Sequence, residues 1–349
     1  IKTHLAKFGN LETLPDKAVI HINDTHPSLC IPELMRIFVD ECGYTWDQSW
    51  DIVCRTINYT NHTVMSEALE TWNEATFQAI LPRIHSIIRE INRRFCEEMF
   101  QKTNGDWDKI SRMAILANSS VRMANLSVVG ANKVNGVSAL HSQILKDRVF
   151  KDFNDVYPEK FTNVTNGIDH RRWLCQSNPG LTNLLKECIG DGFINDASKM
   201  SDFMKFKDDK QVTAELAKIK RENKERFARF LKREGCDILP DPDTLLDVQV
   251  KRLHEYKRQL LNAMHILSLY LDLKDNPNME FQPRTFLFAA KAASGYYMAK
   301  RIIMFISCIA KMINNDPQVN QKLRVIFAEN YRVTMAEYLM PAADVSEQI

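Results

Sequence analysis

The chain has 349 residues, of which 45% are hydrophobic and 26% charged, and its formal net charge at pH 7 is +2. This composition is typical of a soluble globular protein of about two domains and gives no support to nucleic-acid binding. No apolar run approaches the roughly 20 residues that a membrane-spanning helix needs. We recognise no signal peptide, and the eight cysteines form no CxxC pair and have no histidine at metal-ligand spacing, so we expect reduced thiols, a cytoplasmic location and no metal site.

The first half of the sequence alternates short strands with helices. Apolar periodicity predicts a strand at 18–24, helices at 32–41 and 45–56, a return to the sheet at 57–64, a long helical region at about 74–117, a strand at 122–131 and a helix from 139. A turn is expected at Asn166-Gly167.

The second half shows a clearer α/β rhythm. A charged amphipathic helix pair is predicted at 203–235, followed by strands at 245–250, 284–290 and 323–329, with helices after the first strand, at 296–313 and from about 331. Strands that alternate with helices of this length predict parallel βαβ units, and therefore an α/β fold.

Polar clusters follow all three of these strands: KRLHEYK at 251–257, KAASGY at 291–296 and ENYR at 329–332. The carboxyl ends of parallel strands meet at one edge, where ligands bind. The cations of the first cluster stand at a predicted helix start, where the macrodipole disfavours them unless an anion is present. Phosphate fits this site, whereas the alternative is a solvated helix end with extended lysine and arginine side chains. Since the sequence has no Walker or GxGxxG loop, side chains would hold the phosphate.

Two histidine-bearing turns lie in the first half. Asp24 and His26 follow one predicted strand, and Asn61 and His62 follow another. Each turn alone is more typical of local turn chemistry than of a site. Together with the cationic crevice of the second half, they favour a cleft between two domains.

Several segments resemble the α-glucan phosphorylases, the family of glycogen, starch and maltodextrin phosphorylases. The resemblance covers nearly the whole chain and is carried by residues 22–36, 59–70, 165–174, 248–262 and 324–349. It implies two Rossmann-like lobes of a glycosyltransferase-B-type fold, each only partly present. Residues 1–166 would be the C-terminal part of the N-terminal domain, and residues 167–349 the first part of the C-terminal domain, which binds the cofactor.

The resemblance also implies an activity. Family members use inorganic phosphate and pyridoxal 5'-phosphate to release glucose 1-phosphate from α-1,4-glucans with retention of configuration, and they are usually homodimers. A site rich in Lys, Arg and His agrees with this better than with a glycoside hydrolase, which needs two carboxylates.

Site residues are carried over by position. For the two phosphates, the resemblance implies that Lys251 contacts the cofactor phosphate, that Arg252 and Lys257 hold the substrate phosphate, and that Trp173, Tyr331 and Arg332 pack around the cofactor. For the sugar, it implies that His62 and Asn166 bind the glucosyl unit and that Tyr256 touches the sugar. It further implies that Asp24 and His26 line the pocket, that His254 helps to set the active-site loop, and that Tyr296 lies at the pocket mouth.

The sequence departs from the family at two places. It has AAKAASGY at 289–296 where GGKAAPGY is frequent, and Asp169-His170 where Thr-Pro is usual. The lysine that forms the Schiff base with the cofactor is expected beyond residue 349, so we expect this chain alone to be inactive. Two alternatives remain open: a nucleotide-sugar-dependent glycosyltransferase of the same fold, and a non-catalytic glucan-binding module.

Overall fold

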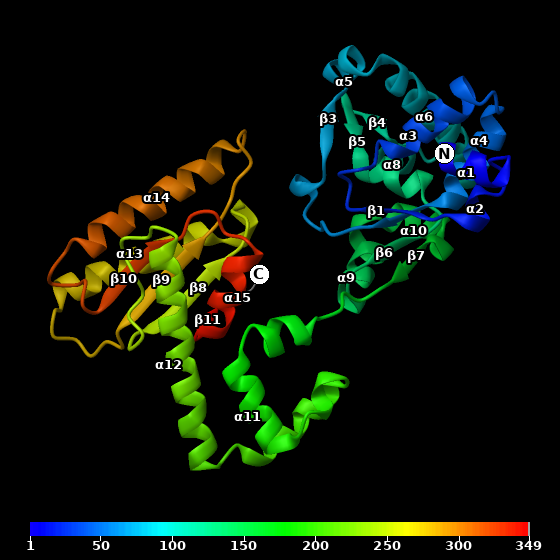
Figure 1. Cartoon of the computed structure of the whole chain (residues 1–349). Helices are drawn as coiled ribbons and strands as arrows, with labels where there is room; N and C mark the ends of the chain where they lie inside the picture. Colours follow the sequence, from blue (N-terminus) through cyan, green and yellow to red (C-terminus); the bar gives the residue numbers. More distant parts are fainter. Residues whose placement is uncertain (348–349) are drawn as a thin grey trace. The chain divides into compact units, whose positions relative to one another are not determined.

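The computed structural model describes residues 1–347, and the chain divides into two compact units, Ile1–Gly167 and Ile168–Ile349. Each unit is built around its own parallel sheet with helices packed on it (Figure 1). The prediction of an α/β fold with a parallel sheet in each lobe is therefore confirmed.

The main sheet of the first unit has the strand order β1-β2-β6-β7, and every neighbouring pair is parallel. Its strands are β1 (Ile20–Asn23), β2 (Ile57–Thr60), β6 (Val134–Gly136) and β7 (Phe161–Asn163). A small antiparallel sheet in the order β3-β5-β4 consists of β3 (Thr71–Asn73), β4 (Leu116–Ala117) and β5 (Ser120–Arg122).

Helices surround the main sheet of the first unit and share one apolar core with it. They are α1 (Lys2–Phe8), α2 (Leu14–Lys17), α3 (Cys30–Arg36), α4 (Trp46–Thr56), α5 (Glu74–Ile80), α6 (Pro82–Lys102), α7 (Trp107–Met113), α8 (Met123–Gly130), α9 (Ala139–Ile144) and α10 (Lys151–Val156). The prediction of a strand at 122–131 is wrong, because this segment forms α8. All eight of its residues are buried, so the segment shows no amphipathic period that would reveal a helix.

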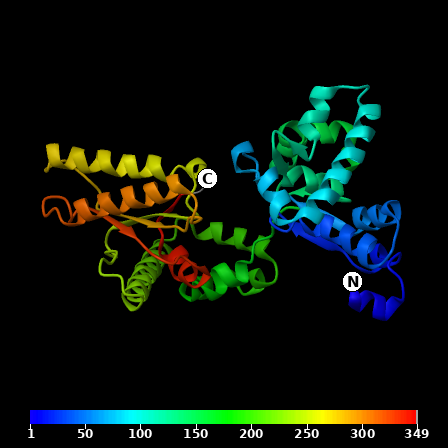
Figure 2. The same cartoon turned by 90° about the horizontal axis from the view of Figure 1, so that it is seen from above.

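The second unit contains a parallel sheet in the order β10-β9-β8-β11. Its strands are β8 (Leu245–Val250), β9 (Arg284–Ala289), β10 (Leu323–Phe327) and β11 (Val345–Ser346), and its helices are α11 (Pro179–Ile189), α12 (Lys210–Arg233), α13 (Gln259–Asp275), α14 (Tyr297–Asn314) and α15 (Val333–Ala342). One apolar cluster joins α13 and α14 to the sheet, and another joins α12 and α15, so the two helix pairs cover opposite faces (Figure 2).

This strand order creates a topological switch point. From β8 the chain steps through α13 to β9 and through α14 to β10, and then returns through α15 to β11, on the other side of β8. The strands that follow β8 in sequence are therefore added first on one side of it, as β9 and β10, and then on the other side, as β11. Ligands of doubly wound sheets bind in the crevice at the carboxyl ends of such strands.

Two further expectations need correction. The helix pair expected at 203–235 is a 3₁₀ segment, Ala197–Phe206, followed by the single long helix α12, which Asp209 caps through the backbone N–H groups of Gln211 and Val212. The α-helix expected directly after β8 begins only at Gln259. Lys251 and Arg252 lie in the loop before it, and Lys257 ends a short 3₁₀ turn, Glu255–Lys257, within that loop. Among residues 1–347, no helix combines the length and the apolar character needed to cross a membrane.

Candidate functional site

The loop that follows β8 presents its cations at the carboxyl edge of the second sheet. The backbone N–H of Lys251 donates to the carbonyl of Ala289 at 3.1 Å, and that of Leu253 donates to the carbonyl of Lys291 at 3.1 Å. The side chain of Leu253 is only 3% exposed and anchors the loop in the core. The loop is thus an ordered continuation of the sheet.

Lys251, Arg252 and Lys257 converge in this loop. Nζ of Lys251 donates a 2.6 Å hydrogen bond to the carbonyl of Glu347, just after β11, which places Lys251 at the switch point. Burial and then the charge of Lys257 lower the pKa of Lys251, and burial and then the charge of Arg252 lower the pKa of Lys257. The three cations are therefore close enough to repel one another.

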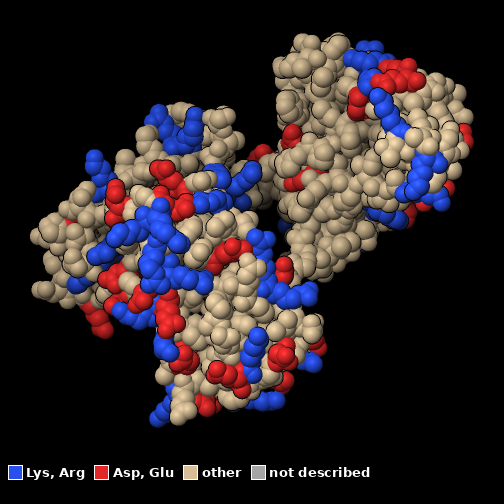
Figure 3. Space-filling model, in the orientation of Figure 1, with Lys and Arg blue, Asp and Glu red and all other residues tan. Residues whose placement is uncertain are grey.

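No carboxylate forms an ion pair with these three side chains in the part of the chain that the structure describes. Elsewhere on the second unit lysine, arginine and acidic side chains are interspersed (Figure 3). Lys274, for example, pairs with Asp316 at 2.9 Å. A cluster of neighbouring cations with which no carboxylate pairs favours an anion.

Aromatic side chains flank the cations. The rings of His254 and Tyr256 lie 4.5 Å apart, and His254 meets Tyr296 edge-on at 5.2 Å. Nζ of Lys257 lies 5.6 Å from the centre of the Tyr256 ring. The structure thus brings together predicted site residues from the ends of β8 and β9, beside a partly exposed tyrosine that can contact a sugar.

The three residues predicted around a cofactor lie elsewhere in the second unit. Arg332 pairs with Glu234 at 2.7 Å, at the end of α12, and Tyr331 follows β10 in a half-buried position that raises its pKa. Trp173 is 37% exposed, and Arg172 lies 5.7 Å from the centre of its ring. Within residues 1–347 no hydrogen bond or ion pair links these residues to the cations after β8, and their role around a cofactor stays a prediction.

In the first unit, predicted residues gather at the carboxyl ends of β1 and β2. The backbone N–H of Asp24 donates to the carbonyl of Thr60 at 2.8 Å, and the hydroxyl of Thr63 donates to the Asp24 carboxylate at 3.2 Å. Nε2 of His62 lies 2.5 Å from Oδ1 of Asn23. The exposed imidazole of His62 and the half-buried carboxylate of Asp24 are thus tied to the same edge.

His26 and Asn166 flank this edge. His26 is exposed, with Nδ1 3.8 Å from the Glu70 carboxylate, which also accepts hydrogen bonds from the Thr25 hydroxyl and the Trp72 indole. The backbone N–H of Asn166 donates to the carbonyl of Val137 at 3.0 Å, so Asn166 follows β7 at the same edge of the sheet.

Sequence reasoning missed His141, on α9 at the end of β6. Its side chain is 8% exposed, Nδ1 accepts from the backbone N–H of Val137 at 3.1 Å, and Nε2 has no hydrogen-bond partner within residues 1–347. Burial, followed by the charge of His62, lowers the pKa of His141, so the neutral form is favoured. The position after a strand of the same sheet was the signal that could have identified it.

Gly136 allows this placement of α9. A Cβ at position 136 would lie 2.5 Å from Oγ and 2.8 Å from Cα of Ser142. Only glycine therefore lets the helix that carries His141 approach the end of β6.

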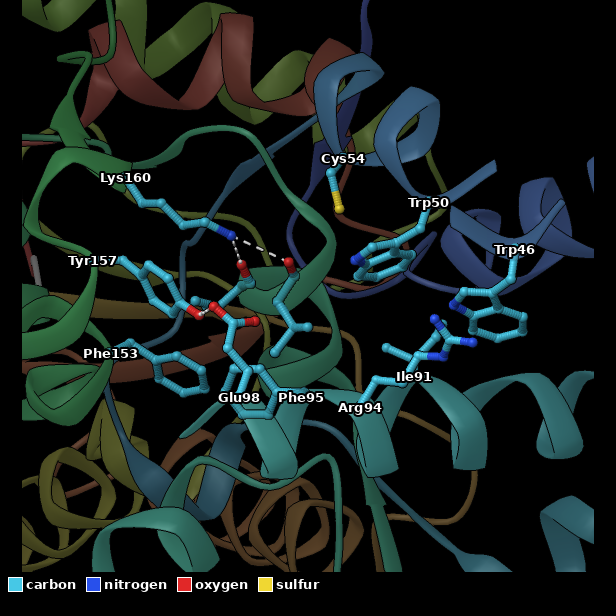
Figure 4. A pocket seen from close by; sticks show the side chains of 12 residues that line it. Trp46, Trp50, Cys54, Ile91, Arg94, Phe95, Glu98, Phe153, Tyr157 and Lys160 are labelled. Atoms are coloured by element: carbon cyan, nitrogen blue, oxygen red, sulfur yellow. Dashed lines mark hydrogen bonds between the residues drawn. The ribbon is translucent and has the colours of Figure 1, made fainter. Parts of the chain in front are cut away.

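A cavity of about 370 Å³ lies in the first unit, but it is at the opposite edge of the sheet (Figure 4). Its lining includes Cys54, Val129 and Lys160, which precede β2, β6 and β7. The polar groups satisfy one another: Lys160 donates to the carbonyls of Val128 and Val129, and the Tyr157 hydroxyl donates to Glu98 at 2.7 Å. We therefore place the candidate site at the carboxyl edge.

Residues 1–347 contain no group of three or more His, Cys, Asp or Glu side chains that could hold a metal ion. The eight cysteines are free thiols. The chemistry that the structure offers in the second unit is accordingly anion binding by lysine and arginine, and in the first unit it is hydrogen bonding by histidine, aspartate and asparagine.

Comparison with known proteins gives one family. The family model for carbohydrate phosphorylase matches residues 1–349. The chain is 49% identical to glycogen phosphorylase, muscle form, from Homo sapiens, over 99% of this chain and 42% of that protein. It is 47% identical to glycogen phosphorylase of Bacillus subtilis (strain 168), over 100% of this chain and 43% of that protein. The chain thus spans less than half the length of these curated relatives.

Proposed function

Because the chain belongs to the carbohydrate phosphorylase family, we propose that it forms part of the active site of an α-1,4-glucan phosphorylase. In this reaction inorganic phosphate cleaves the glycosidic bond of the terminal glucosyl unit, and that unit leaves the glucan as glucose 1-phosphate. The new bond joins a phosphate oxygen to the anomeric carbon, and the departing glucan oxygen receives a proton. A cytoplasmic homodimer belongs to the same proposal and is supported by the family resemblance alone.

One observation carries the proposal: three mutually repelling cations, none of which forms an ion pair within residues 1–347, meet at a topological switch point. Arg252 and Lys257 would hold the substrate phosphate, since a guanidinium binds phosphate oxygens in pairs and an ammonium acts as a point charge. The same positive field would stabilise charge that develops on the phosphate and the sugar during transfer.

The residues present also fit a second phosphate group. Lys251 donates one hydrogen bond, to a neutral carbonyl, and its ammonium has two further N–H groups to offer. Pyridoxal 5'-phosphate, when bound, would supply a phosphate that can hold or release a proton beside the substrate phosphate. We propose that Lys251 contacts that phosphate and that Trp173, Tyr331 and Arg332 form the surroundings of the cofactor.

The first unit would recognise the sugar. Sugar hydroxyls both donate and accept hydrogen bonds, and the edge formed by β1, β2, β6 and β7 offers Asp24, His62 and Asn166 as predicted partners. The neutral His141 adds a buried nitrogen at the same edge. His26 would line the neighbouring pocket. Within the second unit, Tyr256 would touch a sugar, His254 would help to set the active-site loop and Tyr296 would lie at the pocket mouth.

The test is a product assay on the complete protein. With maltodextrin and inorganic phosphate we expect glucose 1-phosphate in its α-configuration, detected by ³¹P and ¹H NMR. A nucleotide-sugar-dependent transferase would instead lengthen the glucan with a nucleoside diphosphate glucose and release no sugar phosphate. A glucan-binding module would bind maltodextrin and do neither.

A further inference from the structure

Two buried glutamines lie beneath the cationic loop. Gln249 belongs to β8 and is 2% exposed, and Gln259 is the first residue of α13 and is 1% exposed. Neither was singled out by the sequence pattern. A buried amide is costly unless it is hydrogen-bonded, so the partners of these two side chains indicate what they do.

Each glutamine holds the backbone of one phosphate-binding candidate. Nε2 of Gln249 donates to the carbonyl of Lys257 at 3.2 Å, and Nε2 of Gln259 donates to the carbonyl of Arg252 at 3.1 Å. The amide oxygens of the two glutamines also have partners. The Asn262 side chain donates to Oε1 of Gln249 at 3.0 Å, and the backbone N–H of His254 lies 3.5 Å from Oε1 of Gln259. The strand and the helix therefore fix the loop from both of its ends.

The loop needs such support for two reasons. Its cations repel one another, so without an anion they favour a more open arrangement. Its last residue, Arg258, has a left-handed backbone with φ 61°, which is strained for a residue other than glycine. Hydrogen bonds to the two carbonyls oppose both effects.

We propose that Gln249 and Gln259 are positioning residues that hold Arg252 and Lys257 in the phosphate-binding arrangement before phosphate arrives. Preorganisation of this kind raises affinity because the anion does not have to assemble its own site. The inference rests on the proposed function in one respect, namely that the anion is the inorganic phosphate of the reaction.

The experiment compares three amide replacements of matched shape in the complete protein. Gln249→Met and Gln259→Met keep the length of the side chain and remove its hydrogen bonds. Asn314→Leu serves as the control, because the Asn314 amide also bonds the backbone of its own unit, at Val325, but on the edge strand β10. Folding of each variant is verified by circular dichroism and urea denaturation.

We expect the KM for inorganic phosphate to rise about 5- to 20-fold in both glutamine variants, with the KM for maltodextrin unchanged. The Asn314→Leu protein should be less stable than the unchanged protein but should have the same KM for inorganic phosphate and the same KM for maltodextrin. Unchanged phosphate KM values in the two glutamine variants, or equal changes in all three proteins, overturn the inference.

A second measurement separates this inference from the proposed function. The dissociation constant of inorganic phosphate is determined by isothermal titration for the unchanged protein and for Gln259→Met, which loses both hydrogen bonds of the amide without adding a charge. Weaker phosphate binding by Gln259→Met supports the positioning role even if the unchanged protein releases no glucose 1-phosphate. Equal binding, or no binding by the unchanged protein, refutes it.

Discussion

The hydroxyl of Tyr296 donates a 2.6 Å hydrogen bond to the carboxylate of Glu255 and accepts one from the backbone N–H of the same residue at 3.2 Å. Glu255 is the single acidic residue of the loop 251–258. Tyr296 comes from the loop after β9, so it ties two strand ends together. Its hydrogen bond also holds the Glu255 carboxylate, the only carboxylate of this loop that could neutralise the neighbouring cations.

Tyr296→Phe should therefore weaken phosphate binding. Without the phenol, the Glu255 carboxylate is released and competes with phosphate for Arg252 and Lys257, and we expect the phosphate KM to rise about threefold. Steady-state assays measure the change. Tyr270→Phe is the control, because its hydroxyl bonds Asp316 at 2.9 Å elsewhere in the unit, and it should leave the phosphate KM unaltered.

Lys257→Ala should lower kcat/KM for phosphorolysis by about 10²- to 10³-fold, the usual effect of removing a group that stabilises developing charge. Lys257→Arg should restore little, since a planar guanidinium does not replace a compact ammonium. Lys274→Ala, which breaks the surface pair with Asp316, is the control. Normal phosphorolysis by Lys257→Ala contradicts the assignment of the site.

The two nitrogens of His141 can be tested separately. His141→Asn keeps an acceptor for the Val137 N–H but has nothing at the position of Nε2, so we expect near-normal stability and a maltodextrin KM raised about tenfold. His141→Leu removes both functions and should also reduce the midpoint of urea unfolding. If the Asn variant binds glucan normally, Nε2 plays no part in sugar recognition.

Asp247, in β8, predicts a pH-dependent stability. It is 5% exposed, and burial, with Glu347 adding to it, raises its pKa to about 6, although Arg284 at 3.6 Å acts in the other direction. Since this pKa lies above the ordinary value near 3.9, the folded state holds the proton more tightly than the unfolded state. The stabilisation is complete below about pH 4 and is lost as the pH rises through 6, by about 2–3 kcal/mol.

Asp247→Asn cannot titrate and provides the reference. Urea denaturation at pH 4, 5, 6 and 7 should show that the unfolding free energy of the unchanged protein falls relative to that of the variant over this window. A difference that stays constant between pH 4 and pH 7 excludes a raised pKa at this position.

Gly136→Ala should destabilise the first unit by about 1–3 kcal/mol, because the added methyl group meets backbone atoms of Ser142 that cannot rotate away. Displacement of α9 should also impair glucan binding through His141. Gly167→Ala is the matched control, since its Cβ would have no neighbour within 4 Å. Equal urea midpoints for the two variants would argue against the close approach at Gly136.

The strands β1, β2, β8, β9 and β10 could be predicted because each lies in a short stretch with alternating or continuous apolar residues. The strands β6 (VNG), β7 (FTN) and β11 (VS) were not predicted, because two or three residues with few apolar side chains show no period. The segment of α8 could not be predicted either, because a helix that is buried on all sides looks like a buried strand over eight residues. In the segment 203–235, the apolar stripe suggested two helices. The segment contains only one α-helix, α12, because the helical structure is interrupted near the start of the segment, between the 3₁₀ residues that end at Phe206 and the N-cap residue Asp209.

The candidate site was predictable where it depends on strand ends. The rule that ligands bind at the carboxyl edge of a parallel sheet directed attention to Lys251, Arg252 and Lys257. Gln249 and Gln259 escaped notice because their role depends on hydrogen bonds to backbone carbonyls. The left-handed conformation of Arg258, between the loop and α13, cannot be predicted from sequence periodicity either.

The hydrogen bond from Lys251 to the carbonyl of Glu347 joins residues that are 96 positions apart. At about 5–20 residues per second, a ribosome needs on the order of 5–20 s to synthesise the intervening chain. During that interval the β8 loop already carries its three positive charges, but β11 has not yet joined the sheet. The contact between the β8 loop and the end of β11 can form only after that interval, and a nascent chain that stalls before residue 347 exposes a cationic loop without its neighbouring strand.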